Sequence, residues 1–391
     1  MNNQKQLDKI ISYNKHNSFF SFSSINDKIK ESDIIKKINF LYNNKIGLES
    51  LNANQLEILK QVINDLNLKS KKKKNTFSIS NNVVDEILTT NDNKILRYLV
   101  FRYRYEIYPI IKKFDDYPPY LQIEPSSICN YRCVFCFETD ESFTNKKNGF
   151  MGKMSFELFK DIIDQALGNI EFISLASRGE PLVNPLISKM LEYCNNKFLN
   201  LKINTNASLL DEKKIHAILS GGVKTIVFSA DAADEKLYSK LRVRGNLNVV
   251  LKNIENFQNT REKKYPNVPI ITRVSGVKFD DEQNFEEMIK LWGGLVDQVA
   301  FVDYNPWENT YLKAPNNVIE SCSDLWRRLF IWWDGKVNPC DVDYKSILSI
   351  GNINEKNISE LWQSDYYKDL RNKHLQGERK SLEPCRSCTV I

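Results

Sequence analysis

Cysteine is the residue type whose spacing in this chain points most clearly to chemistry. Three of the eight cysteines form one short C-x3-C-x2-C run, Cys129, Cys133 and Cys136. Three thiolates on one loop can bind three irons of a [4Fe–4S] cube, which leaves the fourth iron open to a small molecule. A zinc site would normally take a fourth cysteine or histidine nearby, and none is close in sequence. The run therefore predicts a cluster with one exchangeable position.

Four more cysteines form a second, widely spaced set. They are Cys322, Cys340, Cys385 and Cys388. Four thiolates can complete the shell of a second [4Fe–4S] cluster or of a structural zinc ion. The remaining thiol, Cys194, falls near the end of a predicted helix on the outside of the core, and we interpret it as a buried structural residue.

The elements that must position the first run begin at Tyr120, where short apolar segments start to alternate with helical patterns. The predicted strands are residues 120–125, 171–177, 201–206, 225–230, 269–275 and 298–304. The predicted helices lie between them, at about 155–168, 184–195, 210–220, 233–241, 246–260 and 282–293. Six βα repeats imply a parallel sheet with right-handed crossovers, but they are too few for a complete TIM barrel. We predict an α/β fold with a partial (β/α)6 TIM-type barrel over residues 118–304.

Two flanking regions differ from this core. Residues 1–117 are predicted to be a helical N-terminal extension, with an amphipathic helix capped by Asn52 and a second helical stretch over about 83–112. Residues 75–80 are the only short strand candidate there. Residues 305–391 are predicted to be a small cysteine-rich α+β domain. It should contain two short strands around an Asp-Gly turn at 334–335, then one capped helix.

The position of the first cysteine run resembles that in a known enzyme family. C-x3-C-x2-C directly after the first strand of a (β/α)6 barrel is similar to the radical S-adenosylmethionine (SAM) enzymes, and the resemblance covers about residues 119–391. It implies that the open iron binds SAM and that one low-potential electron cleaves it. A 5′-deoxyadenosyl radical then removes a hydrogen atom from a substrate. An electron donor of the flavodoxin or ferredoxin type is also implied.

Segments at the ends of later strands resemble the family's SAM-binding motifs. The sequence Arg-Gly-Glu-Pro from Arg178 is similar to the family's Gly-Gly-Glu-Pro motif, which contacts the SAM amino group, with arginine in place of the first glycine. The resemblance implies SAM-binding roles for Phe135, Gly179, Glu180, Pro181, Thr205, Asn206, Ser229 and Asp231.

The second set of cysteines resembles the C-terminal extension called SPASM in the same family. Full SPASM domains carry seven cysteines, whereas four remain here, as in the shortened Twitch form with one auxiliary cluster. The spacing is similar to that of a cyclitol dehydrogenase of the family. The resemblance therefore implies two [4Fe–4S] clusters, the second ligated entirely by the protein.

Several reactions remain open at this point. A closed auxiliary cluster could accept the electron of a ketyl-type radical, which favours oxidation of a carbohydrate-type small molecule, although dehydration and epimerisation are also possible. The alternative is radical modification of a peptide or protein side chain. A third hypothesis is a non-catalytic zinc-binding scaffold. The substrate-side candidates, which we expect at the barrel mouth, are Arg273, Asp303 and Tyr304.

The composition excludes some partners. A net charge of +6 over 391 residues, with acidic and basic residues interspersed, gives no basic footprint for nucleic acid. No apolar run approaches the roughly 20 residues of a membrane span, and the N-terminus has no apolar signal segment. We expect a cytoplasmic enzyme whose thiols stay reduced.

Overall fold

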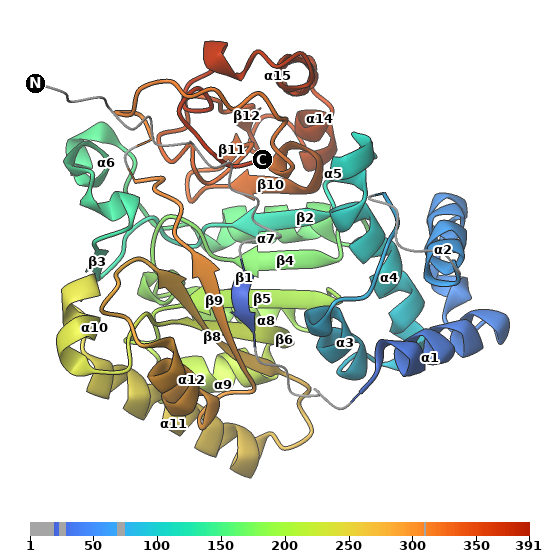
Figure 1. The fold of residues 1–391 in the computed structure, drawn as a ribbon, viewed down its shortest axis with the longest axis horizontal. Coiled ribbons are helices and arrows are strands. Elements are labelled where there is room, and N and C mark those ends of the chain that lie inside the picture. The colour runs from blue at the N-terminus through green and yellow to red at the C-terminus, as the bar shows by residue number, and fades with distance from the viewer. Residues whose placement is uncertain (1–18, 23–28, 69–74, 309) are drawn as a thin grey trace, which may run out of the picture.

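A parallel β-sheet forms the centre of the computed structural model, which describes residues 19–22, 29–68, 75–308 and 310–391 (Figure 1). All six predicted barrel strands are present. They are β2 (Tyr120–Ile123), β4 (Phe172–Leu175), β5 (Asn200–Thr205), β6 (Val223–Ser229), β8 (Ile271–Lys278) and β9 (Gln298–Asp303). They pair in parallel in the order β9-β8-β6-β5-β4-β2, and the sheet does not close on itself. This confirms the predicted partial barrel.

The helices between these strands cover the outer face of the sheet. They are α7 (Phe156–Ala166), α8 (Ile187–Cys194), α9 (Glu212–Ser220), α10 (Glu235–Leu241), α11 (Leu247–Lys264) and α12 (Phe285–Gly293). Side chains alternate along each strand, so Leu121 and Ile123 of β2 pack under the helices while Tyr120 and Gln122 face the lumen. A strand outside the predicted set, β1 (Phe19–Phe22), pairs antiparallel with the free edge of β9.

The N-terminal extension is helical, as predicted. Its helices are α1 (Glu31–Asn43), α2 (Ala53–Leu66), α3 (Asn81–Leu88), α4 (Asp92–Glu106) and α5 (Tyr108–Ile111). Asn52 caps α2 in a capping box with Gln55, as its sequence predicts. The helical stretch predicted over about 83–112 consists of α3, α4 and α5, because Asn91 caps the start of α4 and Pro109 lies in the first turn of the short α5. Residues 75–80 form no strand.

The cysteine-rich region continues the barrel sheet. Its elements are α13 (Asp324–Arg327), β10 (Arg328–Ile331), β11 (Lys336–Asn338), β12 (Gly351–Asn352), α14 (Ile358–Trp362) and α15 (Asp365–Leu375). β10 pairs in parallel with β2, and β10 and β11 form the predicted hairpin around Gly335. The one helix expected after the hairpin is two helices, because Ser364 caps a separate α15. The C-terminal domain therefore shares one continuous sheet with the barrel.

Short elements complete the described chain. They are β3 (Arg132–Cys133), β7 (Arg242–Val243), α6 (Glu141–Thr144), η1 (Leu48–Ser50), η2 (Phe137–Thr139), η3 (Lys146–Asn148), η4 (Pro181–Val183) and η5 (Arg379–Ser381). None of the described helices combines the length and hydrophobicity required to cross a bilayer.

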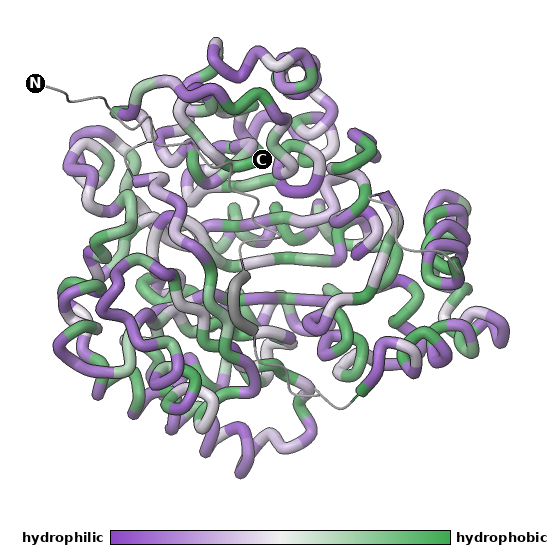
Figure 2. Tube along the Cα trace, viewed as in Figure 1, coloured by the Kyte–Doolittle hydropathy of each residue, from purple (hydrophilic) through white to green (hydrophobic). Residues whose placement is uncertain are grey.

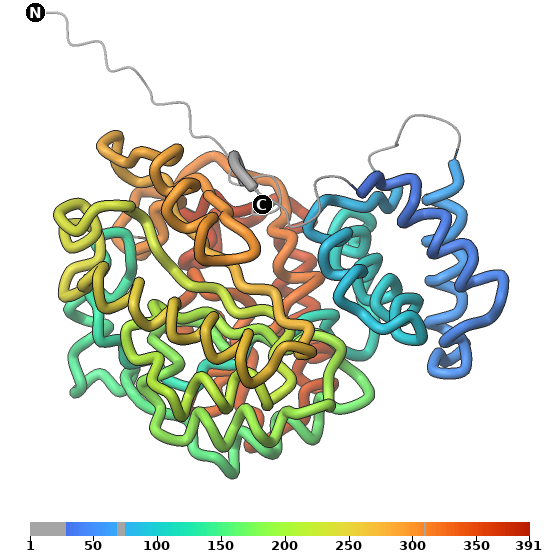
Figure 3. Tube along the Cα trace, turned by 90° about the horizontal axis from the view of Figure 1, so that it is seen from below, coloured from blue at the N-terminus to red at the C-terminus, as the bar shows by residue number. Residues whose placement is uncertain are grey.

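The N-terminal helices form a group beside the barrel (Figure 3) and have their own hydrophobic core. Hydrophobic segments follow the strands and the helix faces turned toward them, whereas the outer helix turns are hydrophilic (Figure 2). The two cores meet at the amino-terminal end of the barrel. There Phe101 of α4 stacks on Phe172 of β4 with ring centroids 4.1 Å apart, and Tyr105 lies 5.7 Å from Tyr120. These rings join the extension to the barrel floor.

Replacing Phe101 with alanine should lower the free energy of unfolding by about 3–5 kcal/mol, because a buried ring is lost from this junction. The midpoint of urea unfolding of the anaerobically reconstituted protein measures the effect. Phe40→Ala is the matched control, since Phe40 is 60% exposed, and it should change stability by less than about 0.5 kcal/mol. Equal losses in the two variants would mean that the stacked pair does not hold the extension in place.

Candidate functional site

The carboxyl ends of the barrel strands surround a cavity of about 430 Å³. This is the end at which barrel enzymes place their active sites. The sequence-predicted residues that line it are Cys129, Cys133, Phe135, Cys136, Gly179, Glu180, Thr205, Asn206, Ser229, Asp303 and Tyr304. Pro181, Asp231 and Arg273 do not line it.

The cysteine run lies on the loop that leaves β2 and enters the mouth of this cavity. The loop is fixed at Cys133, which pairs with Arg242 in the small β3–β7 ladder. The Tyr131 backbone N–H points at the Cys129 sulfur (3.4 Å), and an Arg242 guanidinium N–H lies 3.8 Å from the Cys133 sulfur. Burial raises the pKa of Cys129 to about 12 and also raises the pKa of Cys133 and Cys136. Thiolates buried in this way need cations beside them, which suits a cluster of iron ions.

The Gly-Glu segment after β4 packs directly on that loop. A Cβ atom at Gly179 would lie 2.4 Å from the Ser126 carbonyl oxygen, so only glycine fits this close approach. The Glu180 carboxylate accepts hydrogen bonds from Thr205 Oγ1 (2.7 Å) and the Asn206 N–H (2.7 Å). Burial raises the pKa of Glu180 above its usual range. Glu180, Thr205 and Asn206 all line the cavity, and the Thr205 hydroxyl is directed at Glu180.

Asp231 does not reach the cavity, and sequence reasoning missed the residue in front of it. The Asp231 carboxylate accepts the Val277 N–H and forms a buried ion pair with Arg242, whose NH2 lies 2.6 Å from Oδ2. Arg242 is therefore the charged group that faces the cavity from this side, and Asp231 holds it in position. In the sequence Arg242 follows a helix rather than a strand, so its position there did not indicate that it faces the cavity.

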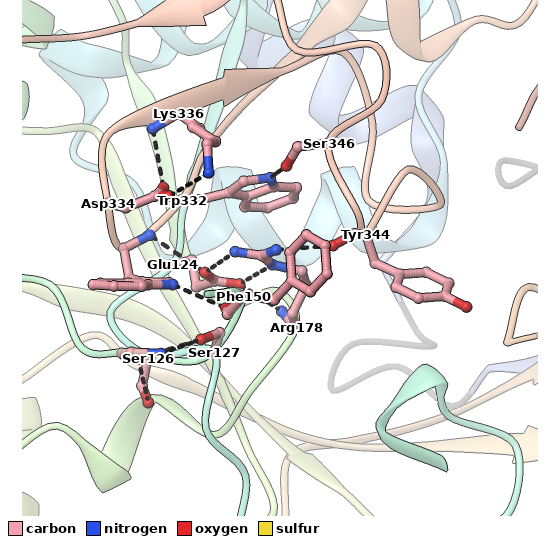
Figure 4. Close-up of polar contacts among 12 residues, drawn as sticks. Glu124, Ser126, Ser127, Phe150, Arg178, Trp332, Asp334, Lys336, Tyr344 and Ser346 are labelled. Atoms are coloured by element: carbon pink, nitrogen blue, oxygen red, sulfur yellow. Dashed lines mark hydrogen bonds and ion pairs between the residues drawn. The ribbon is translucent and has the colours of Figure 1, made fainter. Parts of the chain in front are cut away.

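A second arginine, Arg178, occupies the position where the family has glycine. Its guanidinium forms two bonds to the Glu124 carboxylate, 2.7 Å from Nε to Oε2 and 2.6 Å from NH2 to Oε1. It also donates to the Tyr344 carbonyl (2.9 Å) and lies 4.3 Å from the centre of the Trp332 ring. Figure 4 shows Glu124 and Arg178 directed at each other beside Trp332. Both charged side chains are buried, at 2% and 0% exposure.

The second set of cysteines lines one small enclosed cavity in the C-terminal domain. His374 and Arg379 line it as well. Burial lowers the pKa of His374 to about 3, so its ring is neutral, and Nδ1 accepts the Cys322 N–H at 3.3 Å. The ring proton is then on Nε2, which is buried and has no partner among the described residues; the same holds for Nε of Arg379. Two unsatisfied donors beside four thiols fit an anionic cluster, whose sulfur atoms can accept hydrogen bonds.

No three His, Cys, Asp or Glu side chains of the described residues lie close enough together to hold a single metal ion. The thiolates of a [4Fe–4S] cube each bind a different iron, so their sulfurs surround a cluster rather than one ion.

The other two predicted features lie away from the mouth. Arg273 faces inward from β8 but near its amino end, where Nε donates to Gln298 (2.8 Å), so the expectation that it faces the barrel mouth is wrong. Cys194 ends α8 and is 2% exposed within the outer core, as predicted for a structural thiol.

The comparison with known families agrees with this site. Residues 123–291 match the radical SAM superfamily, and residues 322–389 match SPASM, an iron–sulfur cluster-binding domain. Together the two matches span more than half of the chain. The protein belongs to the radical SAM superfamily and is an enzyme that uses SAM and iron–sulfur clusters, with a SPASM-type domain after its barrel.

Its relatives act in different ways. The chain is 23% identical to a tungsten-containing aldehyde ferredoxin oxidoreductase cofactor-modifying protein of Pyrococcus furiosus, over 64% of this chain and 83% of that protein. It is 22% identical to the SAM-dependent 2-deoxy-scyllo-inosamine dehydrogenase of Niallia circulans, over 69% of this chain and 92% of that protein. Among solved structures, BtrN in complex with AdoMet and 2-DOIA matches with 18% identity and a TM-score of 0.45, over 69% of this chain and 92% of that chain.

Replacing Arg178 with methionine should lower the free energy of unfolding by about 3–5 kcal/mol, because it leaves the Glu124 carboxylate buried without a counter-charge. The matched double variant, Arg178→Met with Glu124→Leu, should recover most of that loss, since neither charge then remains. Urea unfolding of the wild type, of the single variants Arg178→Met and Glu124→Leu, and of the double variant gives the coupling energy of the pair. Additive losses in the double variant would contradict a direct interaction of this size.

Proposed function

We propose that this enzyme is a radical SAM dehydrogenase of a carbohydrate-type small molecule. The observation that carries the proposal is the cavity at the barrel mouth, where the cysteine run and hydrogen-bonding side chains meet. Besides the cysteines, its wall includes Gln122, Ser174, Asn204, Asp303 and Asn305. A wall rich in amide, hydroxyl and carboxylate groups suits a ligand with several hydroxyls. The inosamine dehydrogenase relative, matched over nearly its whole length, supports the same class of substrate.

The two cofactors have separate places in this proposal. Cys129, Cys133 and Cys136 would hold the cluster that binds SAM, with Glu180, Asn206, Ser229 and Phe135 around SAM. Arg242 supplies a positive charge beside Cys133 for the SAM carboxylate, whereas Asp231, for which the resemblance implied a SAM-binding role, holds Arg242 in position. The four C-terminal cysteines would hold the auxiliary cluster. When bound, SAM and its cluster supply the hydrogen-abstracting 5′-deoxyadenosyl radical, and the auxiliary cluster supplies an electron acceptor.

Asp303 is the residue that we propose to accept the hydroxyl proton of the substrate. It follows the last barrel strand and lines the cavity, and among the described residues no ion pair or hydrogen bond engages its side chain. Its neighbour Tyr304 is less suited, because its hydroxyl donates to the Glu308 carboxylate and because burial raises the pKa of Tyr304. We place the enzyme in the cytoplasm, with a flavodoxin- or ferredoxin-type electron donor.

Anaerobic reconstitution should load about eight irons per chain, and replacing Cys129, Cys133 and Cys136 together with alanine should leave about four. The triple variant should form no 5′-deoxyadenosine from SAM and reductant, because only this cluster would have an open iron. Cys194→Ala is the control, since it removes a thiol far from the cavity, and it should keep full iron and full SAM cleavage. Stoichiometric zinc in the wild-type protein would instead indicate the scaffold hypothesis.

Incubation of the enzyme with SAM, reductant and a panel of aminocyclitols and sugars should give a product lighter than its substrate by the mass of a hydrogen molecule. Asp303→Asn should lower the rate of this reaction by at least about a hundredfold, because the general base is lost. SAM cleavage without substrate should be unchanged in that variant. An equal-mass product carrying solvent deuterium, or turnover of a peptide instead, would overturn the dehydrogenase assignment.

A further inference from the structure

The barrel lumen continues below the proposed SAM site. Lys202 lies in the middle of β5, and its side chain faces inward, because Leu201 and Ile203 on either side belong to the outer core. Lys202, Tyr120 and Arg328 line the mouth cavity and also a second cavity of about 520 Å³ at the amino-terminal end of the barrel. These three residues therefore stand where the two cavities meet.

The second cavity is rich in positive charge. Its cationic side chains are Arg102, Lys202, Arg273, Arg327 and Arg328. The acids around it already have partners. Glu106 pairs with Arg102, Asp324 pairs with Arg327, and Asp85 accepts a hydrogen bond from Gln298.

Lys202 has no such partner. The acidic group that acts on it, Glu86, accepts a hydrogen bond from the Tyr98 hydroxyl at 2.6 Å. Within the part of the chain that the structure describes, Lys202 forms neither an ion pair nor a hydrogen bond. The lumen therefore holds an excess of positive charge around an ammonium group that faces open space.

We propose that Lys202 and Arg328 bind an anionic group of the substrate, a phosphate or a carboxylate, inside the barrel lumen. This inference rests on the proposed function and narrows its substrate class from a carbohydrate-type molecule to an acidic one. The mouth cavity runs from the cysteine loop to Lys202, so one ligand can place its anionic end on Lys202 and its reacting carbon near SAM.

Neighbouring side chains fit this role. Gln122, Ser174 and Lys202 are paired across β2, β4 and β5, so an amide and a hydroxyl flank the ammonium group on the same lumen face. Arg328 pairs with Tyr120 on the next strand, and its guanidinium is oriented by the Tyr105 hydroxyl at 2.9 Å. A bound oxyanion would accept charge-assisted hydrogen bonds from Lys202, which forms none with the described residues, and from Arg328.

The state of Lys202 gives the site a pH dependence. Burial, with Arg273 and Arg328 nearby, lowers the pKa of Lys202 to about 7, while Glu86 opposes the shift. The other charged or titratable groups that face this space are Arg102, Arg327, Tyr105 and Tyr120. A bound anion favours the protonated amine, so binding should be tighter at pH 6 than at pH 8. A hexuronate probe suits this comparison, because its carboxylate stays ionised over that range.

The test is calorimetric titration of the reconstituted enzyme, with SAM and without reductant, using glucose 6-phosphate, glucuronate and glucose. At least one anionic probe should bind at least about tenfold more tightly than glucose, and which one does so distinguishes phosphate from carboxylate. Lys202→Met should lose at least about tenfold in affinity for that probe, and Lys202→Arg should retain binding. Lys197→Met is the matched control, since Lys197 lies over the Tyr193 ring outside the lumen, and it should bind as wild type does.

Equal affinity for glucose and both anions, or unchanged binding in a folded Lys202→Met variant, would overturn the anion site. Circular dichroism checks the fold of each variant. The proposed function has its own readout, because SAM cleavage to 5′-deoxyadenosine by the wild-type enzyme does not require the anion. SAM cleavage without anion binding would contradict the anion site alone. Absence of SAM cleavage would instead contradict the assignment of the cysteine run to a SAM-binding cluster.

Discussion

The buried ion pair between Glu124 and Arg178 is the interaction on which the arrangement of the site depends. It joins the end of β2, which leads into the cysteine loop, to the end of β4, which leads into the Gly-Glu segment. The same two side chains reach the C-terminal domain through the Tyr344 carbonyl and the Trp333 N–H. Two charges out of water are stable only when their hydrogen bonds are complete, so this pair tolerates one geometry. It thereby fixes the mouth cavity and the C-terminal domain relative to each other.

This constraint explains the departure from the family motif. Glycine at position 178 would leave Glu124 without its partner and would remove the cation beside Trp332. The domain interface here is therefore polar at its centre and sheet-paired at its edge, where β10 continues β2. Arg178 therefore affects the site by positioning the backbone at the ends of β2 and β4.

Hydrophobic periodicity was enough to predict all six barrel strands and the helices between them, because parallel strands covered by helices have a strong pattern. The cysteine spacing predicted two separate groups of thiols. The inner charges could not be predicted in the same way. Arg242 follows a helix and reaches the cavity only through the β3–β7 ladder, which joins residues over a hundred positions apart. Lys202 was visible as a polar residue within a strand, but the sequence did not show which cavity it would face.

The N-terminal helices have a structural place in this scheme. An open barrel exposes the amino-terminal end of its lumen, and polar side chains there would be hydrated and screened. The α3–α4 region covers that end with Phe101, Tyr105 and the start of α3, and it contributes the acid Glu86 near Lys202. Closing the floor lowers the local dielectric, which strengthens the attraction of Lys202 and Arg328 for an anion. The extension that looks separate from the catalytic barrel in sequence therefore sets the electrostatics of its interior.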